Sequence, residues 1–181
     1  MSKVGKKVIA LPTGVEATLQ GQLLSVKGPK WTLSYTLLDG VQVTIENSEL
    51  TVFVADEEKR NLRGLTRTLI ANMVEGVAHG YEKKLMITWV GYGAKLEGKK
   101  MVLSIWYSHK VDFVVPQSIE VSVEQDIKWN TIVTMKGIDK QYLWEVAAKL
   151  KALKKPEPYK GKGIRYFDEY IKLKPGKATK K

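Results

Sequence analysis

One pattern of alternating residues occurs twice in the chain, and this internal repeat restricts the fold more than any other feature of the sequence. Residues 24–34 align with residues 94–104 at a constant spacing of 70 positions. In both segments a glycine, followed closely by a lysine, separates two runs of alternating apolar residues, which predicts a β-hairpin with a positive φ at the glycine. Two further pairs of strand-like segments follow, and by the last pair the spacing has grown to 80; they are 41–46 with 119–124, and 51–54 with 131–134.

Each copy of the repeat ends in a predicted helix. The first helix follows the acidic residues 56–58, which suit a helix N-terminus, and its apolar stripe consists of Leu62, Leu65, Leu69, Met73 and Val77. The second has Asp139 as its expected N-cap and ends before Pro156, with a stripe of Leu143, Val146, Ala147, Leu150 and Leu153. A sheet with one apolar face and a helix with one apolar stripe bury these surfaces against each other, so the predicted fold class is α+β.

The predicted architecture is therefore a tandem duplication of a small domain in which an antiparallel β-sheet packs on one α-helix, followed by a basic C-terminal extension. The predicted domains are 1–82, the N-terminal repeat, 83–173, the C-terminal repeat with the main binding surface, and 174–181, a basic tail ordered only by a partner. Residues 157–166 are too rich in glycine and proline for a helix and are expected to form an ordered loop or extended segment. Residues 167–173 are expected to form a short strand.

Positive charge is concentrated near the C-terminal end. The formal net charge of the 181 residues is +11, and residues 1–82 contribute none of it, with nine basic and nine acidic residues. Residues 149–181 alone carry twelve basic and three acidic residues. A localised excess of this kind indicates a polyanionic partner, although a solvated basic tail that only keeps the protein soluble is the alternative.

Several classes of protein are disfavoured by the composition. The absence of cysteine excludes disulfide scaffolds, thiol nucleophiles and cysteine-ligated metal sites. We expect no metal site, no cofactor and no small-molecule substrate, since His79 and His109 have no catalytic partner at a recognisable spacing. No apolar run is long enough to span a bilayer, and the N-terminal residues do not form an export signal, so no membrane partner and a cytoplasmic location are expected.

The candidate binding residues lie mainly in residues 159–166, where basic residues alternate with glycines and tyrosines. Lysine and arginine neutralise phosphates, glycine lets the backbone approach a phosphate chain, and tyrosine stacks or donates a hydrogen bond. Residues 93–100 fit the spacing of a phosphate-binding loop, but Lys100 stands where a hydroxyl is needed and a strand pattern follows, so a basic hairpin tip is preferred. The five tryptophans are candidates for base stacking, but Trp31 and Trp106 near predicted strands and Trp144 beside a helix stripe are more typical of core residues.

The motif of residues 156–166, Pro-Glu-Pro-Tyr-Lys-Gly-Lys-Gly-Ile-Arg-Tyr, resembles the C-terminal signature of the bacterial-type large-subunit ribosomal protein six family. Further similarity is found in 1–7, 26–30, 72–77, 80–85, 107–109, 136–141 and 145–148. The resemblance implies a duplicated α+β fold and a non-enzymatic protein that binds 23S-type rRNA near the sarcin–ricin loop and the stalk base, where it has neighbouring ribosomal proteins.

The resemblance and the charge pattern together give the expected rRNA-binding residues. They are Tyr159, Lys160, Gly161, Lys162, Gly163, Arg165, Tyr166, Lys172, Lys174, Lys177, Gly91, Tyr92, Lys95, Lys99, Lys100, Ser108, His109 and Lys110. The chain departs from the family where glycine is usual, at Trp31, Trp89, Trp106 and Trp144, and Gly93 stands where a basic residue is usual. An RNA-binding protein, RNA-directed enzyme or RNA chaperone that acts off the ribosome is the alternative function.

Overall fold

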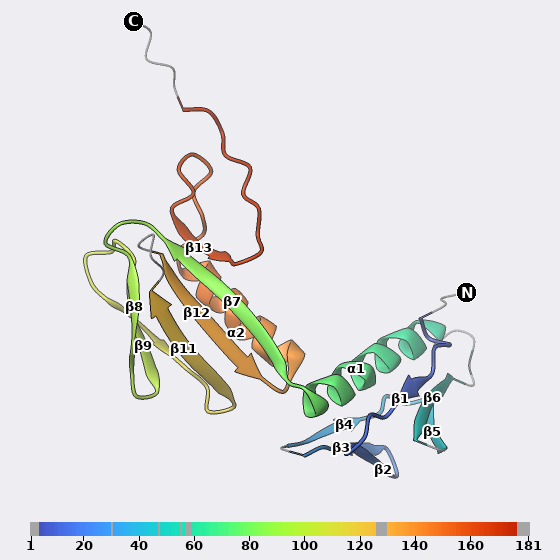
Figure 1. Ribbon diagram of the computed structural model, residues 1–181. Helices are drawn as coiled ribbons and strands as arrows, with labels where there is room; N and C mark the ends of the chain where they lie inside the picture. The colour runs from blue at the N-terminus through green and yellow to red at the C-terminus, as the bar shows by residue number, and fades with distance from the viewer. Residues whose placement is uncertain are drawn as a thin grey trace, which may run out of the picture. The chain divides into compact units, whose positions relative to one another are not determined.

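The computed structural model describes residues 4–29, 31–46, 48–54, 56, 59–125 and 130–176. The chain divides into two compact units, of which the first comprises Met1–Tyr81 with Ile138–Lys140 and the second Glu82–Gly137 with Gln141–Lys181. Each unit contains β-sheets and one long helix (Figure 1). The predicted α+β class with a duplicated small domain is confirmed.

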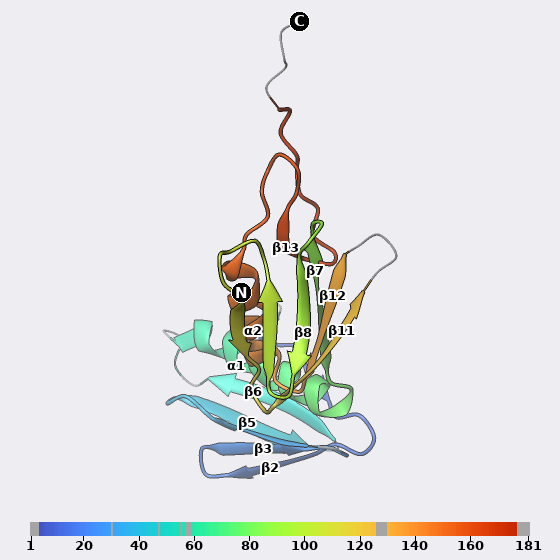
Figure 2. The same cartoon turned by 90° about the vertical axis from the view of Figure 1, so that its left-hand side faces the viewer.

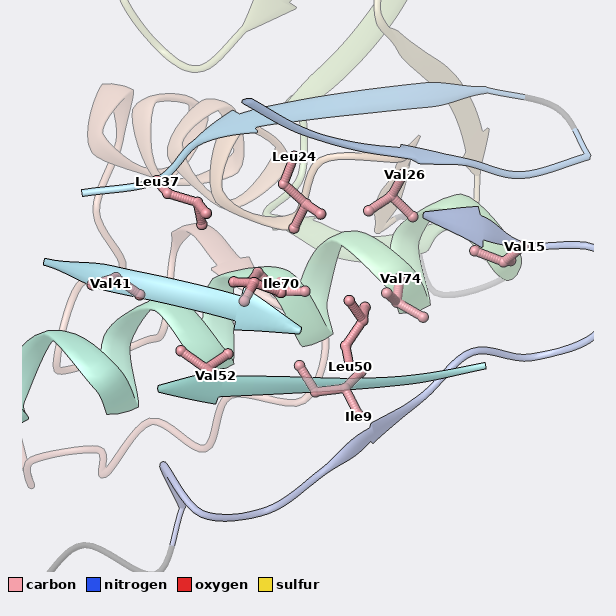
Figure 3. Close-up of a cluster of buried hydrophobic side chains, with 11 residues drawn as sticks. Ile9, Val15, Leu24, Val26, Leu37, Val41, Leu50, Val52, Ile70 and Val74 are labelled. Atoms are coloured by element: carbon pink, nitrogen blue, oxygen red, sulfur yellow. The ribbon is translucent and has the colours of Figure 1, made fainter. Parts of the chain in front are cut away.

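The first unit consists of two small antiparallel sheets and one helix. Its elements are β1 (Ile9–Ala10), β2 (Glu16–Gln20), β3 (Leu23–Lys27), β4 (Thr32–Thr36), β5 (Val41–Glu46), β6 (Glu49–Val54) and α1 (Arg60–Ala78). One sheet has the order β1-β6-β5 and the other β2-β3-β4. Ile70 and Val74 of α1 pack among buried strand residues such as Leu24, Leu50 and Val52 (Figure 3), so the burial of apolar surface holds helix and sheets together.

The face of α1 that enters this core differs from the predicted stripe. Thr66, Ile70, Val74 and Val77 are buried, whereas Leu65 is 50% exposed. Successive helical residues are rotated by about 100°, so Leu65 cannot share the face on which Thr66 and Ile70 lie. The predicted stripe is therefore correct at Val77 and wrong at Leu65, because the pattern gave a leucine more weight than a threonine in a better position.

The second unit repeats this plan and adds one strand. Its elements are β7 (Tyr81–Thr88), β8 (Gly93–Glu97), β9 (Lys100–Ser104), β10 (Val111–Val114), β11 (Ile119–Gln125), β12 (Thr131–Gly137), α2 (Lys140–Leu153) and β13 (Gly163–Tyr166). The sheets have the orders β11-β12-β7-β13 and β10-β9-β8. Figures 1 and 2 show α2 along one face of the larger sheet, and its buried residues, Leu143, Val146, Ala147 and Leu150, confirm the predicted stripe except at the half-buried Leu153.

Strand order shows that the repeat was aligned in the wrong register at its first hairpin. The strands β2, β3 and β4 correspond in chain order to β8, β9 and β10, so the counterpart of the β8–β9 hairpin is β2–β3 and not β3–β4. The matching turn glycines are Gly21 and Gly98, and both have a φ of 62°. The sequence alignment of 24–34 with 94–104 matches β3–β4 to β8–β9, one strand too far along the chain. This error arises because consecutive strands share the same two-residue period of apolar residues.

Gly28, which the sequence pattern assigned to a turn with positive φ, serves close packing instead. A Cβ atom built there would overlap the side chain of Val77 and lie 2.7 Å from the Val77 carbonyl oxygen.

The predicted equivalence of 51–54 with 131–134 is also wrong in register. Val54 pairs with the first residue of β5 and Gly137 with the first residue of β11, so these two residues are the true counterparts.

The last strand lies upstream of its predicted position. Residues 167–173 form no strand, whereas β13 extends the larger sheet by pairing antiparallel with β7, with Ile164 opposite Ile87. Ile164 is fully buried. The strand was not predicted because a glycine begins it and only one aliphatic residue supports it, and its stability depends on the free edge of β7.

Candidate nucleic-acid interface

Lys160 and Lys162 lie in a loop that is fixed at its C-terminal end. After α2 the Ile164 N–H donates to the Lys154 carbonyl oxygen at 2.8 Å, and Ile164 then enters the core as part of β13. We call residues 157–162 the basic loop. Because β13 pairs with β7, the C-terminal end of the loop is attached to the larger sheet of the second unit.

Two backbone hydrogen bonds close the basic loop. The Glu157 N–H donates to the Lys162 carbonyl oxygen at 2.8 Å, and the Gly161 N–H donates to the Glu157 carbonyl oxygen at 3.0 Å. Gly161 has a φ of 72°, the left-handed conformation that glycine adopts most easily. The turn leaves Tyr159 and Lys160 exposed at its tip. The sequence prediction of an ordered, non-helical segment is confirmed here.

The chain after β13 returns to the basic loop and brings more lysines to it. The Lys174 N–H donates to the Pro158 carbonyl oxygen at 2.8 Å, and the Lys172 and Lys174 side chains are exposed. The loop and this returning segment form the red projection of the second unit in Figures 1 and 2. Lys177 lies outside the described residues. The structure thus brings Lys160, Lys162 and Lys174 into one basic region, in which Lys160 and Lys174 are exposed and Lys162 is half-buried.

Gly163 is where the loop meets the end of α2. A Cβ atom at this position would lie 2.8 Å from the Lys155 carbonyl oxygen and 2.9 Å from that of Lys154, and the φ of 138° disfavours any side chain. Glycine is required here for a close backbone approach, so its part in the site is to position the loop.

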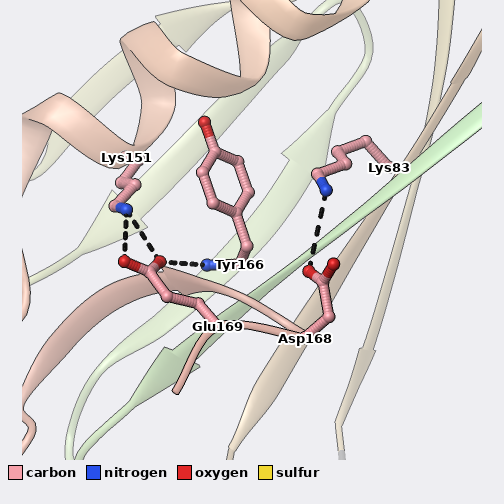
Figure 4. A network of polar contacts seen from close by, with 5 residues as sticks. All are labelled: Lys83, Lys151, Tyr166, Asp168 and Glu169. Carbon is pink, nitrogen blue, oxygen red and sulfur yellow. Dashed lines mark hydrogen bonds and ion pairs between the residues drawn. The ribbon is translucent and has the colours of Figure 1, made fainter. Parts of the chain in front are cut away.

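Tyr166 is engaged within the protein (Figure 4). Its ring lies between two ammonium groups, with Lys83 Nζ 4.8 Å and Lys151 Nζ 4.6 Å from the ring centroid. Its N–H donates to Glu169 Oε2 at 3.1 Å, and Lys151 Nζ donates to both carboxylate oxygens of Glu169 at 2.7 Å. Tyr166 and Glu169 therefore anchor the segment that follows β13, and the Tyr166 ring has little free surface for a base.

This anchor predicts a pH dependence. Hydrogen bonds from Lys151, and then the Tyr166 N–H, hold the pKa of the Glu169 carboxyl below its ordinary value of 4.5. A lowered folded-state pKa means that the stabilisation is complete above 4.5 and is lost as the pH falls through the folded value. We expect the Tyr166 amide resonance in NMR spectra to titrate with a midpoint below pH 4.5, and Lys151→Met to return it toward 4.5; a midpoint above 4.5 in the unchanged chain would contradict the anchor.

Arg165 is half-buried on β13. Its guanidinium nitrogen Nη2 lies 3.5 Å from the Met86 sulfur, a weak acceptor, and its Nε is buried. Within the described part of the chain this Nε has no hydrogen-bond partner. An unsatisfied buried donor is unfavourable, so this Nε adds nothing to the stability of the free chain.

A second group of predicted residues meets the basic loop through aromatic contacts. Gly91, with a φ of 81°, forms a turn in which the Tyr92 N–H donates to the Trp89 carbonyl oxygen at 3.2 Å. Lys162 Nζ lies 3.8 Å from the Trp89 ring centroid and Lys160 Nζ lies 6.0 Å from it. The contact between Lys162 and Trp89 joins the Gly91 turn to the basic loop.

Residues after β9 lie beside the end of α2. Tyr107 donates from its hydroxyl to the Leu153 carbonyl oxygen at 2.9 Å, and its ring stacks on His109 with centroids 6.3 Å apart. Ser108, His109 and Lys110 are exposed. Lys154 Nζ, which the sequence analysis did not single out, lies 4.5 Å from the Tyr107 ring centroid and adds positive charge to this region.

The basic hairpin tip is separate from these residues. Lys95, Lys99 and Lys100 are exposed on the β8–β9 hairpin, which confirms that this segment is a hairpin and not a phosphate-binding loop. Figures 1 and 2 both place the turn of this hairpin at the opposite end of the second unit from the basic loop. These lysines do not form one patch with Lys160 and Lys162.

Two tryptophans that the sequence pattern assigns to a core are exposed. Trp106 is 70% exposed and Trp31 is 55% exposed, so the prediction that they pack in a core is wrong, and Trp129 lies outside the described residues. Trp89 and Trp144 are half-buried. The signal for the exposure of Trp106 is the polar run Ser108-His109-Lys110 that follows it closely. Lys83 Nζ lies 5.5 Å from the Trp144 ring centroid, whereas nothing in the structure explains the tryptophan at 31.

The described residues contain no group of three or more histidine, aspartate or glutamate side chains able to hold a metal ion. In the part of the chain that the structure describes, no helix has both the length and the apolar character that a membrane span requires. The chemistry that the site offers is thus that of lysine ammonium groups, tyrosine and tryptophan rings, and exposed backbone.

Comparison with known proteins gives a consistent result over the whole chain. The family described as "Ribosomal protein L6" matches residues 11–80 and 90–167, one segment in each unit. The "Large ribosomal subunit protein uL6" of Syntrophomonas wolfei is 49% identical over 180 residues, which cover 98% of each chain. The protein of that name from Synechocystis is 49% identical over 183 residues and 100% of each chain, and uL6c of Porphyra purpurea is 44% identical over 182 residues and 99% of each.

Proposed function

Because this chain belongs to the ribosomal protein L6 family, we propose that it is a structural constituent of the large ribosomal subunit in the cytoplasm and binds 23S-type rRNA. It works by binding and not by catalysis. Two relatives that carry the name of a large-subunit protein align with this chain over nearly their full lengths, which supports the assignment.

The basic loop is the single observation that supports rRNA contact at this end of the chain. It exposes Lys160, holds Lys162 beside an aromatic turn, and has Lys174 hydrogen-bonded to its backbone. Lysines on a fixed backbone bind phosphates in one orientation without reading the base sequence, which suits folded rRNA. We therefore assign the main rRNA contact to residues 83–173 and a supporting contact to the tail 174–181.

The remaining predicted residues have different parts in this proposal. The residues that contact RNA directly are Tyr159, Lys160, Lys162, Lys172, Lys174, Ser108, His109 and Lys110. Four others hold the loops in place, and they are Gly91, Gly161, Gly163 and Tyr166. Tyr92 borders the aromatic turn, and Arg165, half-buried on β13, contributes positive charge close to the basic loop. Lys95, Lys99 and Lys100 form a separate contact at the hairpin tip. The site lies near the sarcin–ricin loop and the stalk base, beside the proteins of the stalk base.

Cosedimentation tests this proposal directly. We expect one copy of the chain in each large subunit after a high-salt wash, and a density map of that particle should place it near the sarcin–ricin loop and stalk base. A chain that remains mostly in a free pool, or that turns over RNA or nucleotide there, would instead support the off-ribosome alternative.

A further inference from the structure

Trp106 combines two properties that are seldom found together. Its backbone φ is 59°, in the left-handed region, and its side chain is 70% exposed. A bulky residue in this conformation is strained, because its Cβ atom crowds the following carbonyl oxygen. Burial of the ring does not offset this strain, since most of the ring is in water. Strain that packing does not explain is found most often at binding sites.

The surroundings of Trp106 are aromatic and cationic. Tyr92 meets its ring edge to face, with centroids 6.4 Å apart and an interplanar angle of 75°. Lys162 Nζ lies 5.7 Å from its ring centroid while also lying 3.8 Å from that of Trp89. The positions that follow it, Ser108 to Lys110, are exposed. An ammonium group and a largely free indole face thus lie within a few ångströms of each other.

We propose that Trp106 is a stacking site for one unpaired base of the bound RNA, with Lys162 on the phosphate beside that base; this inference rests on the proposed rRNA binding. A nucleotide offers the two chemistries that the pair of side chains can use, a flat ring for the indole and an anion for the ammonium. Lys162 and the exposed polar residues Ser108 to Lys110 match the phosphate and the base of a nucleotide, which favours this ligand over a lipid surface.

Stacking and phosphate binding differ in their response to salt, which separates this inference from the proposed function. Loss of an ion contact lowers the slope of log affinity against log salt concentration, whereas loss of stacking lowers the affinity at every salt concentration. We expect Trp106→Ala in the full chain to weaken binding of large-subunit rRNA about tenfold or more with an unchanged slope. Trp106→Phe, which keeps a ring, should bind nearly as well as the unchanged chain.

Trp106→Gly is the matched variant for the backbone. It removes the ring, as Trp106→Ala does, and also relieves the strain at φ 59°, so it should bind as weakly as Trp106→Ala but melt about 2–4 °C above it. Tryptophan fluorescence supplies an independent readout. Octa-adenylate should quench the unchanged chain more than Trp106→Phe, and an octamer of abasic nucleotides, which keeps the phosphates, should not.

Three results would overturn the stacking site. They are rRNA binding by Trp106→Ala at full affinity, equal quenching by the abasic octamer, and a fluorescence response to anionic phosphatidylglycerol vesicles but not to octa-adenylate. If replacement of Lys160 and Lys174 by alanine weakens rRNA binding and the Trp106 variants do not, only the stacking site fails. If the unchanged chain shows no salt-dependent rRNA binding, the proposed function itself fails.

Discussion

Gly163→Ala should destabilise the second unit by about 2–4 kcal/mol. The added methyl group would meet the carbonyl oxygens of Lys154 and Lys155 at 2.8 to 2.9 Å, and these atoms belong to the backbone, so they cannot rotate away as a side chain would. The alanine would also have to adopt a φ of 138°. Either β13 separates from β7, which exposes the fully buried Ile164, or the turn after α2 is displaced.

Urea denaturation of the full chain measures this loss, and hydrogen exchange at the amides of β13 locates it. Gly161→Ala is the matched control, because this glycine also has a positive φ, 72°, but the nearest atom to its added methyl group would be Leu173 Cδ2 at 3.7 Å. The control should lose only about 1 kcal/mol, the strain of the left-handed conformation. Equal losses at the two positions would contradict the close packing at Gly163.

The sequence was sufficient to predict the duplicated α+β fold because patterns of two and 3.6 residues are local. It was not sufficient to align the repeats, since the two-residue period is the same in every strand, and Gly28 was paired with Gly98 in place of Gly21. The prediction that Leu65 enters the core is wrong because the helical pattern weights a leucine above the neighbouring Thr66, which is the residue that is buried. An amphipathic pattern gives the existence of a helix more reliably than its buried face, which the packing partners decide.

The basic loop was found from composition and from the resemblance, but its working parts required the structure. Nothing in the spacing of residues 157–166 shows that Gly163 packs on the backbone after α2 or that Tyr166 is held between Lys83 and Lys151. The role of Trp106 was hidden because exposure and φ are tertiary properties. Large aromatic residues are buried in most contexts, and this general tendency gave the wrong result at Trp106.

Replacing the lysines of the basic region should cause the largest loss of rRNA affinity. In the triple variant Lys160→Ala, Lys162→Ala and Lys174→Ala, up to three phosphate contacts disappear while the turn hydrogen bonds, all made by backbone atoms, are kept. Each phosphate contact contributes roughly 0.7 to 0.9 to the slope of log affinity against log salt, so the slope should fall by about 2 to 3. At about 0.1 M salt this corresponds to an affinity loss of about 100-fold.

A control of equal charge is available in the first unit, where Lys6, Lys7 and Lys27 are exposed. Their replacement by alanine lowers the net charge by the same three units, so any general effect of charge on association with a polyanion appears equally in both variants. Circular dichroism and the urea midpoint show whether each variant is folded, which keeps a loss of affinity from being confused with unfolding.

The salt dependence of binding to large-subunit rRNA, compared between these two triple variants, tests the central claim most directly. The basic loop as the main rRNA contact predicts a slope lower by about 2 to 3 for the variant at Lys160, Lys162 and Lys174, and a nearly unchanged slope for the variant in the first unit. Equal slopes for both folded variants, or a larger change for the first unit, would contradict the account.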